Sequence, residues 1–509
     1  MDTFSAVLGD LLSRCISFAI DRCHQQHQGV EEEGNLQRLR RVLLRIQAVV
    51  EEADGRCITN RVMLQQLSTL RDAMYRGCYF LDNSRCRTIQ AHATYEVGDH
   101  SPGLSPFSPL KRLCISTGAW KILPRAVEKN ELQRMLDHLE TVVSDMQEFV
   151  VFVSSYPRVP RQPYCSYLLL ENCMFGRQAE QERVIKFLLE PRPPGAAKGI
   201  DVLPIIGPGG VGKSTLVEHV CFDERVRRCF STIVYYGPDS IRGGSLTVLA
   251  DTGMIKHRNP VTTEQSLVII EPGNDMDDET WRGILHSLRD GHITTVSKII
   301  ITSRSKEMAT FGTTEALQLD FLTKEAFWYF FKTIVFGSTN PEEEPKLASI
   351  CMELATMVDG SFMGAHIFGD ILRSNFSAQF WYRFLKCYKF YTDMHVRQVG
   401  EHPSEVYRGI SGRTSIWTSK NRFVTTATYA VTYRLYEASS ANLDDQSIVP
   451  VNDVFIGNFQ IQGKIDVLLW RSKIPPYYSY IAHYEVLARQ PQMLPNKRKR
   501  SRPLAEGLV

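Results

Sequence analysis

A glycine-rich segment that follows an apolar run constrains the fold of this chain more than any other feature. Residues 202–206 read VLPII and are followed directly by GPGGVGKST at residues 207–215. This is the complete phosphate-binding pattern G-x-x-x-x-G-K-[ST], which needs a β-strand before it and an α-helix after it. Leu216, Val217 and Val220 supply the helical spacing on the far side. We therefore predict a strand–loop–helix unit that holds the phosphates of a nucleotide.

The residues of this pattern have separate physical tasks. Glycines let successive backbone N–H groups turn toward a phosphate, and the N-terminus of the following helix adds the positive end of its dipole. Lys213 is expected to reach the β- and γ-phosphates, and the Ser214 hydroxyl to bind Mg²⁺. A glycine-rich turn that binds nothing is the alternative, but the full pattern in its strand–helix setting favours binding. The predicted cofactor-binding residues are Gly207, Pro208, Gly209, Gly210, Val211, Gly212, Lys213, Ser214 and Thr215.

Length and composition set further bounds. At 509 residues the chain is too long for one hydrophobic core, so we expect about two to four domains. A net charge of +3 gives no reason to expect nucleic acid as a partner. No apolar run approaches the roughly 18–20 residues of a membrane span, and residues 1–20 lack the basic start of a signal peptide. The 12 cysteines include no C-x-x-C pair, which indicates reduced thiols in the cytoplasm or nucleus.

Four segments near the N-terminus carry apolar side chains three or four positions apart. Such stripes predict amphipathic helices over residues 4–23, 36–53, 67–81 and 132–153. Residues 91–110 are rich in Ser, Pro and Gly and are predicted to form a loop. Helices of this length bury their stripes against one another as a four-helix bundle. On periodicity alone, a purely structural bundle explains them better than a signalling one.

The middle of the chain alternates strand and helix patterns. Prolines 157, 160 and 163 end the last bundle helix, and a short helix ending near Leu189 precedes the phosphate-binding pattern. Strand–helix alternation after such a pattern predicts a parallel, doubly wound sheet. Besides residues 202–206, the predicted strands are Thr232–Tyr236, Leu267–Ile270, Lys298–Thr302 and Ala316–Leu319, with a helix over Thr280–Leu288.

The remainder divides into a helical and a β-rich part. Residues 324–389 have helical spacing, whereas residues 424–436 and 454–469 are rich in Thr, Val, Tyr and Ile and predict strands. We therefore expect a helical bundle over 1–158, a P-loop nucleotide-binding domain over 172–335, a helical subdomain over 336–390 and a β-rich region of unknown role over 391–509.

The order of bundle, GPGGVGKST and a later SKIIITSR resembles the plant nucleotide-binding resistance proteins, whose switch module is called NB-ARC. The bundle is similar to their Rx-type coiled-coil domain. The resemblance covers residues 1–389 and is most specific at Phe175–Glu180, the phosphate-binding pattern, Asp223–Val226 and Ser297–Arg304. It implies a defence-signalling switch that binds ADP at rest and ATP when active, with Mg²⁺. Leucine-rich repeats normally follow in that family.

The resemblance also assigns a role to Arg304. It corresponds to the arginine that reads the γ-phosphate in that family, and a guanidinium suits this task because it is always charged and can bond two oxygens. A surface ion pair at the end of a strand is the alternative. The position at the carboxyl end of a parallel strand favours the functional role.

Three departures from the family pattern weaken the case for ATP hydrolysis. The apolar strand over residues 268–270 is followed by Glu271 and Pro272, where the family has two aspartates. Glu271 keeps a carboxylate that, with Ser214, is the predicted metal site, but Pro272 cannot orient a water. Residues 360–363 read GSFM in place of Gly-Leu-Pro-Leu, and neither the second helical subdomain nor a leucine-rich pattern is recognised.

These features leave two main hypotheses. The first is a truncated intracellular immune receptor with a signalling bundle on a nucleotide switch. The second is a degenerate scaffold or decoy that holds nucleotide and pairs with a complete receptor. A small-molecule kinase on the same fold is weaker, because no acceptor site is recognised.

The partners predicted by either hypothesis are other coiled-coil resistance proteins or a second copy of this chain. They are expected to pair through the stripe over residues 36–53, whose flanking charges could select a partner helix. The basic run at residues 497–502 is either a nuclear import signal or a solvated end.

Overall fold

The computed structural model describes four large parts of the chain. These are residues 28–96, 125–158, 174–191 with 199–237, and 265–400 apart from 273–275 and 291–295. Shorter described segments are 254–258, 402, 415–418, 422–435, 448–451, 453, 464–474 and 478–486. The chain divides into two compact units, Met1–Leu385 with Lys473–Pro475, and Lys386–Ser472 with Pro476–Val509. Each unit is described by itself.

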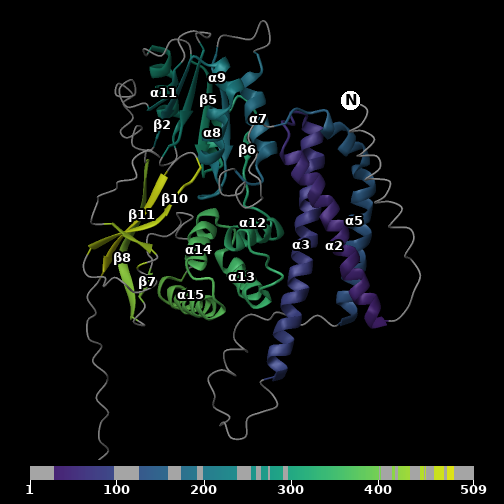
Figure 1. Ribbon diagram of the computed structural model, residues 1–509. Coiled ribbons are helices and arrows are strands. Elements are labelled where there is room, and N and C mark those ends of the chain that lie inside the picture. The colour runs from purple at the N-terminus through teal and green to yellow at the C-terminus, as the bar shows by residue number, and fades with distance from the viewer. Residues whose placement is uncertain are drawn as a thin grey trace, which may run out of the picture. The chain divides into compact units, whose positions relative to one another are not determined.

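The first unit begins with three long helices that lie side by side (Figure 1): α2 (Gln28–Asp54), α3 (Arg61–Glu96) and α5 (Arg125–Ser154). Their apolar stripes are buried between them, which confirms the helices predicted over 36–53, 67–81 and 132–153. Buried members include Leu39, Leu43, Ile46, Leu67, Leu70, Leu136, Leu139 and Phe149. The stripe over residues 4–23 lies outside the described residues.

Two expectations about these helices need correction. Residues 91–96, predicted to be loop, extend α3 to Glu96. The stripe over 36–53, proposed as a partner-binding face, is used inside the bundle, where Leu39 and Ile46 are fully buried. The large apolar side chains that the described part of the bundle exposes include Leu44, Val62, Val151 and Phe152.

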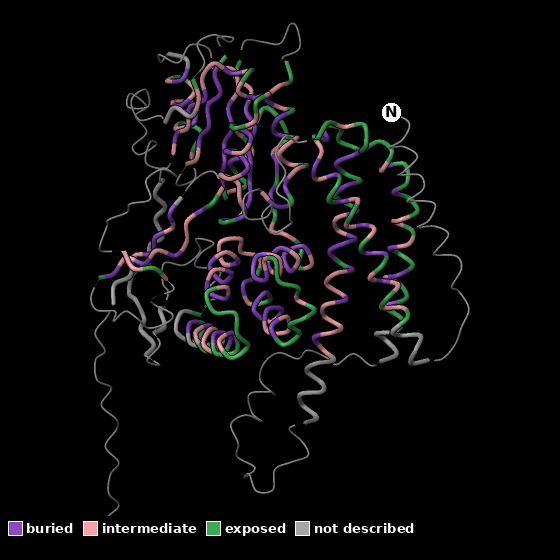
Figure 2. The backbone as a smooth tube through the Cα atoms, in the orientation of Figure 1, coloured by how far each residue is buried: buried purple, intermediate pink, exposed green. Residues whose placement is uncertain are grey.

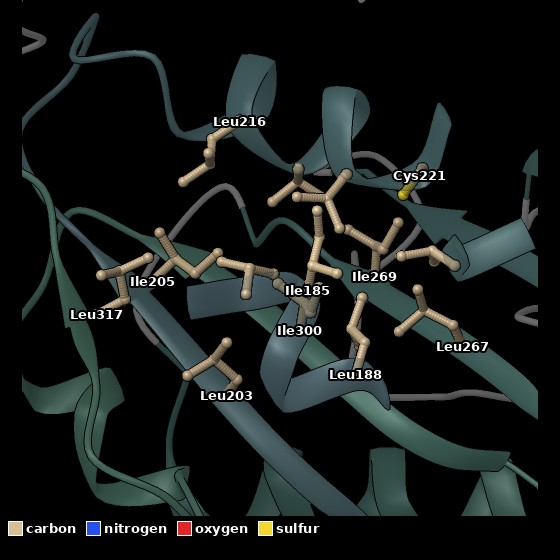
Figure 3. Close-up of a cluster of buried hydrophobic side chains, with 14 of the residues drawn as sticks. Ile185, Leu188, Leu203, Ile205, Leu216, Cys221, Leu267, Ile269, Ile300 and Leu317 are labelled. Atoms are coloured by element: carbon tan, nitrogen blue, oxygen red, sulfur yellow. The ribbon is translucent and has the colours of Figure 1, made fainter. Parts of the chain in front are cut away.

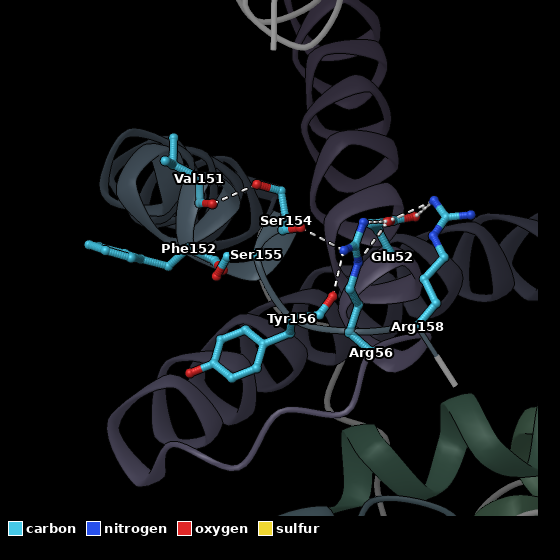
Figure 4. Close-up of polar contacts among 8 residues, drawn as sticks. All are labelled: Glu52, Arg56, Val151, Phe152, Ser154, Ser155, Tyr156 and Arg158. Atoms are coloured by element: carbon cyan, nitrogen blue, oxygen red, sulfur yellow. Dashed lines mark hydrogen bonds and ion pairs between the residues drawn. The ribbon is translucent and has the colours of Figure 1, made fainter. Parts of the chain in front are cut away.

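Arg56 joins the end of α2 to the end of α5 (Figure 4). Its guanidinium donates to the Glu52 carboxylate and to the carbonyl oxygens of Ser154 and Tyr156, both at 2.7 Å. The last carbonyls of a helix have no partner within the helix, and this side chain satisfies that of Ser154, the last residue of α5. Arg158 donates to the same Glu52 carboxylate at 3.0 Å. Although burial acts to raise the pKa of Glu52, these arginines lower it overall.

The centre of the first unit is a six-stranded mixed sheet of order β3-β2-β4-β5-β1-β6. Its strands are β1 (Asp201–Ile206), β2 (Thr232–Tyr236), β3 (Met254–Arg258), β4 (Ser266–Ile270), β5 (Val296–Ser303) and β6 (Leu317–Gln318). All predicted strands are present, but β3 was not predicted. It pairs antiparallel with β2 at the edge, whereas the other pairings are parallel. The wholly parallel sheet expected from the sequence is therefore wrong at this edge.

Helices cover both faces of this sheet. On one face α7 (Gln178–Leu189), α8 (Lys213–Phe222) and α9 (Glu224–Cys229) bury a cluster that Figure 3 shows with Ile205, Ile269 and Ile300. On the other face α11 (Asp278–Asp290) and the 3-10 helix η3 (Glu307–Phe311) pack on the alternate strand residues, including Ile301. Buried residues run along the central strands (Figure 2), as expected for a sheet covered on both sides.

Four helices follow the sheet: α12 (Lys324–Phe336), α13 (Pro345–Val358), α14 (Phe362–Ser374) and α15 (Ala378–Val399). The helical pattern over residues 324–389 is thus confirmed. Bundle helix α3 packs against α12 and α13. At this contact Asp82 Oδ2 accepts from Trp328 Nε1 at 2.9 Å and from Lys332 Nζ at 2.6 Å. Nearby, the Tyr75 ring lies 5.0 Å from the Tyr329 ring.

The Asp82 carboxylate keeps the Lys332 ammonium charged although the contact is buried. The Asp82 and Lys332 side chains are only 16% and 17% exposed. Burial acts to lower the pKa of Lys332, but the Asp82 carboxylate more than offsets this and raises it overall. The ammonium therefore stays charged at neutral pH and depends on its partner.

The second unit contains a five-stranded sheet of order β7-β8-β11-β10-β9. Its strands are β7 (Ser415–Thr418), β8 (Arg422–Leu435), β9 (Ile448–Pro450), β10 (Lys464–Arg471) and β11 (Tyr478–Val486). Strands β7, β8, β11 and β10 pair antiparallel in turn, and β9 pairs parallel with β10. A β-rich C-terminal region was the expectation from the sequence.

We predict that Asp82→Ala lowers the free energy of unfolding by about 3–5 kcal/mol, because it leaves the Lys332 ammonium buried without its carboxylate. Urea unfolding of the full chain measures this. Arg228→Ala is the control, because the Arg228–Glu224 pair is 80% and 82% exposed and should contribute less than about 1 kcal/mol. Equal losses of unfolding free energy in the two variants would show that the buried pair stabilises the fold no more than the exposed pair does.

Candidate functional site

The residues that connect β1 to α8 form a loop with two left-handed glycines. We call Gly207–Gly212 the glycine loop. Gly210 and Gly212 have φ of 75° and 95°, a backbone conformation that other residues rarely adopt. Gly212 is the N-cap of α8 and provides no side-chain hydrogen bond to the first turn. No N-cap side chain therefore bonds the first backbone N–H groups of α8, and N–H groups at such a helix start can bind an anion.

The start of the glycine loop is fixed by its two neighbouring strands. The Gly207 N–H donates to the carbonyl oxygen of Ser303 at 3.1 Å, and the Leu319 N–H donates to the Ile206 carbonyl at 2.8 Å. A Cβ atom added to Gly207 would meet the Leu319 carbonyl oxygen at 2.3 Å. Only glycine fits here, which gives a packing reason for the first residue of the motif.

Lys213 lies folded over this loop. Its Nζ donates to the carbonyl oxygens of Gly207 at 2.7 Å and Pro208 at 2.9 Å. Burial, together with the charge of Arg304, lowers the pKa of Lys213 to about 8, and Glu271 partly opposes the shift. An anionic phosphate in the loop would add negative charge beside this half-buried ammonium.

Ser214 and Glu271 converge from two different elements. Ser214 Oγ, in the first turn of α8, lies 3.0 Å from each carboxylate oxygen of Glu271, which follows β4. Tyr235 OH, on β2, donates to Glu271 Oε2 at 2.8 Å. These hydrogen bonds hold the carboxylate beside the glycine loop. Tyr235 was not singled out from the sequence, because it belongs to no phosphate-binding motif.

These groups fit a magnesium ion better than a metal held by protein alone. Mg²⁺ prefers oxygen ligands and usually keeps several waters, with one or two carboxylates and the phosphates of a nucleotide. Within the described parts of the chain, no three His, Cys, Asp or Glu side chains gather as a metal site. Ser214 and Glu271 would therefore hold Mg²⁺ only together with a bound phosphate.

The remaining predicted site residues surround the same loop. Val211 is buried and Thr215 half-buried in the first turn of α8. Arg304 follows β5 directly and is exposed, and its charge acts on Lys213. Pro272 follows Glu271 and has neither an N–H donor nor a polar side chain. The predicted binding residues thus lie at the carboxyl ends of β1, β4 and β5, where ligands of open α/β sheets bind.

The sequence is similar to that of plant disease resistance proteins. Residues 3–112 match the Rx N-terminal domain. The chain is 23% identical over 361 residues to the disease resistance protein RGA2 of Solanum bulbocastanum, which covers 68% of this chain and 35% of RGA2. It is 24% identical over 372 residues to a disease resistance RPP13-like protein 1 of Arabidopsis thaliana, covering 69% and 34%. The chain is a homologue of plant disease resistance proteins.

This resistance-protein homologue spans about a third of the length of the relatives it matches. Its helical N-terminal region and mixed central sheet are consistent with an α/β NTPase-like fold. Among solved structures, PCH-2 of C. elegans is 11% identical and covers 41% of this chain and 67% of its own, with a TM-score of 0.28. In the residues that the structure describes, no helix is long and apolar enough to span a membrane.

The lowered pKa of Lys213 leads to a pH-dependent prediction. If ADP binds in the glycine loop, its negative charge raises the pKa of Lys213 from about 8, so binding takes up protons. At pH 8 the uptake should be about half a proton, and above pH 8 the affinity should fall by up to about tenfold per pH unit.

Calorimetry in two buffers of different ionisation enthalpy measures this uptake. Measurement between pH 7.5 and 9 avoids titration of the phosphate, whose pKa is about 6. Binding without proton uptake over this range would show that Lys213 does not face the phosphates.

Proposed function

We propose that this chain binds ADP or ATP, with Mg²⁺, as the nucleotide-binding module of a plant defence protein. The observation that carries the proposal is the convergence of Lys213 and the Ser214–Glu271 pair on one glycine loop. A half-buried cation, a hydroxyl beside a carboxylate, and the N–H groups at the start of a helix are the parts that a nucleotide phosphate with its metal requires. Homology to disease resistance proteins supports the defence context.

In this proposal each group has a defined task. The N–H groups at the start of α8 and Lys213 bind the phosphates, and Ser214 and Glu271 hold Mg²⁺. Magnesium would supply neutralisation of charge between the outer phosphates. Tyr235 keeps the Glu271 carboxylate turned toward Ser214 through its 2.8 Å hydrogen bond. Arg304 is proposed to sense whether the outermost phosphate is present.

We further propose that the nucleotide is exchanged more readily than it is cleaved. Hydrolysis needs a group that orients the attacking water. Pro272 stands where the family has its second aspartate, and its ring can neither accept nor donate a proton. The protein would then act as a switch reset by exchange, or as a scaffold or decoy that holds nucleotide without cycling and pairs with a complete receptor.

The partner in that pairing is proposed to be another resistance protein with a similar bundle, or a second copy of this chain. The match to the Rx N-terminal domain supports a role in protein interaction. Because the stripe over residues 36–53 is occupied, pairing would use side chains that the bundle exposes, such as Leu44 or Phe152. The proposed location is the cytoplasm or the nucleus.

The binding proposal predicts that Lys213→Ala weakens ADP binding about tenfold to hundredfold. The variant loses a charge-assisted contact worth roughly 1.5–3 kcal/mol. Calorimetry on the full chain measures this, with Lys346→Ala as the control because Lys346 is exposed on α13. Equal ADP affinity in the wild type and the Lys213 variant would refute the proposal.

The hydrolysis proposal predicts slow phosphate release by the wild type in a single-turnover assay with labelled ATP. Pro272→Asp restores an acid and should accelerate release by at least about tenfold, since a well-placed base contributes about 10²–10⁴. Pro272→Asn, similar in size but without a basic carboxylate, should give no gain. Rapid release by the wild type would mean that another residue orients the water.

A further inference from the structure

The sheet of the second unit contains a buried serine at its centre. Ser479 lies on β11, which is the middle strand of the five and pairs with β8 and β10. The residue is 3% exposed, and its Oγ makes no hydrogen bond to any residue that the structure describes. Nearly all buried polar side-chain atoms in proteins are hydrogen-bonded. The Ser479 hydroxyl therefore indicates a missing ligand or water.

Ser479 has an arginine beside it on each neighbouring strand. Its register partner on β10 is Arg471, and its register partner on β8 is Arg434. Residues directly opposite each other in an antiparallel pair have Cα atoms about 4.5–5.5 Å apart, and their side chains lie on the same face of the sheet. Arg471 therefore shares the face of Ser479.

An irregularity in β10 places Arg471 on this face. The register between β10 and β11 shifts between Leu468 and Trp470, so that β10 has one extra residue there. Side chains alternate along a regular strand, and without the shift Arg471 would lie on the face opposite to that of Asp466, five positions earlier. Such bulges often re-aim a side chain beside a functional site. Here the bulge brings Asp466, Arg471 and Ser479 to one face.

The acid that lies nearest to Arg471 in the register of these three strands is already paired. It is Asp466, whose Oδ1 lies 2.7 Å from His483 Nδ1 on β11. The Asp466 and His483 side chains are 36% and 32% exposed, so this face is open to solvent at that pair. Arg471 itself is half-buried. The positions beside Ser479 therefore carry positive charge, whereas the nearest acid of these strands is bonded to a histidine.

These groups define the chemistry of a ligand. A serine hydroxyl donates one hydrogen bond, and a guanidinium is always charged and can donate two parallel hydrogen bonds to an oxyanion. A tetrahedral oxyanion such as phosphate offers separate oxygens to both groups. The positive charge of Arg471 disfavours a metal cation at the same place. A phosphate group is therefore the ligand that fits the hydroxyl and the guanidinium together.

We propose that Ser479 and Arg471 bind a phosphate group, with Arg434 at the register position for a second arginine. The hydroxyl donates to one phosphate oxygen, and the guanidinium donates to the others. This site lies in the second unit and shares no residue with the glycine loop, so it is independent of the proposed nucleotide site. It gives the β-rich region, for which no role was predicted, a ligand of defined charge and shape.

The test is a calorimetric titration of the full chain with inorganic phosphate at constant ionic strength. It uses the Lys213→Ala variant, in which phosphate binding by the glycine loop is weakened. This variant should bind phosphate at least about tenfold more tightly than acetate. Adding Ser479→Ala should weaken phosphate binding about tenfold or more, because a hydrogen bond to a charged group is lost. The melting temperature without phosphate should not fall, because the removed hydroxyl has no hydrogen bond to a described residue.

The charge is tested by Arg471→Gln, which should weaken phosphate binding at least as much as Ser479→Ala. Lys464→Gln is the matched control, because Lys464 is exposed at the start of β10 and the variant loses the same charge. It should leave the affinity for phosphate unchanged.

Three results would overturn the inference. The first is phosphate binding that neither Ser479→Ala nor Arg471→Gln weakens. The second is a lower melting temperature of Ser479→Ala with unchanged phosphate affinity, which would show that the hydroxyl is structural. The third is phosphate bound no more tightly than acetate, or not bound at all, by the Lys213→Ala variant.

Discussion

The insertion of β1 between β5 and β6 is the constraint on which the rest of the site depends. Parallel pairing on both sides fixes Ile206, and the close approach of Gly207 to the Leu319 carbonyl sets where the chain leaves the sheet. From that point the left-handed Gly210 and Gly212 turn the backbone into α8. The positions of Lys213 and Ser214 follow from this path, because they are the first two residues of the helix.

Most of the architecture could be predicted because its signals are local. Apolar stripes identified the bundle helices, and β-branched runs identified the buried strands, since burial on both faces demands them. Strand β3 was not predicted because its sequence, MIKHR, has the polar character of an edge strand. Residues 91–96 were predicted to be loop from their composition, but they continue the long helix α3, which begins at Arg61.

The site was predictable only where a motif fixed the residue type. Glycine, lysine and serine in the loop, and the acid after β4, are required by chemistry and so appear in the pattern. Tyr235 acts through where the sheet order brings it, because β2 lies beside β4 and Glu271 follows β4. A tyrosine in a strand is typical of ordinary β propensity, so only the folded arrangement reveals that this one supports a carboxylate.

The shared use of Asp82 has a consequence for how this protein can change over evolution. One carboxylate serves an indole and an ammonium that belong to α12, while the carboxylate itself belongs to the bundle. Changes at Asp82 on α3 and at Lys332 on α12 are therefore coupled, because replacing either residue alone leaves the other charge buried without its partner. A chimera that exchanges only the N-terminal bundle between relatives should therefore require an acid at this position, whatever else the donor sequence brings.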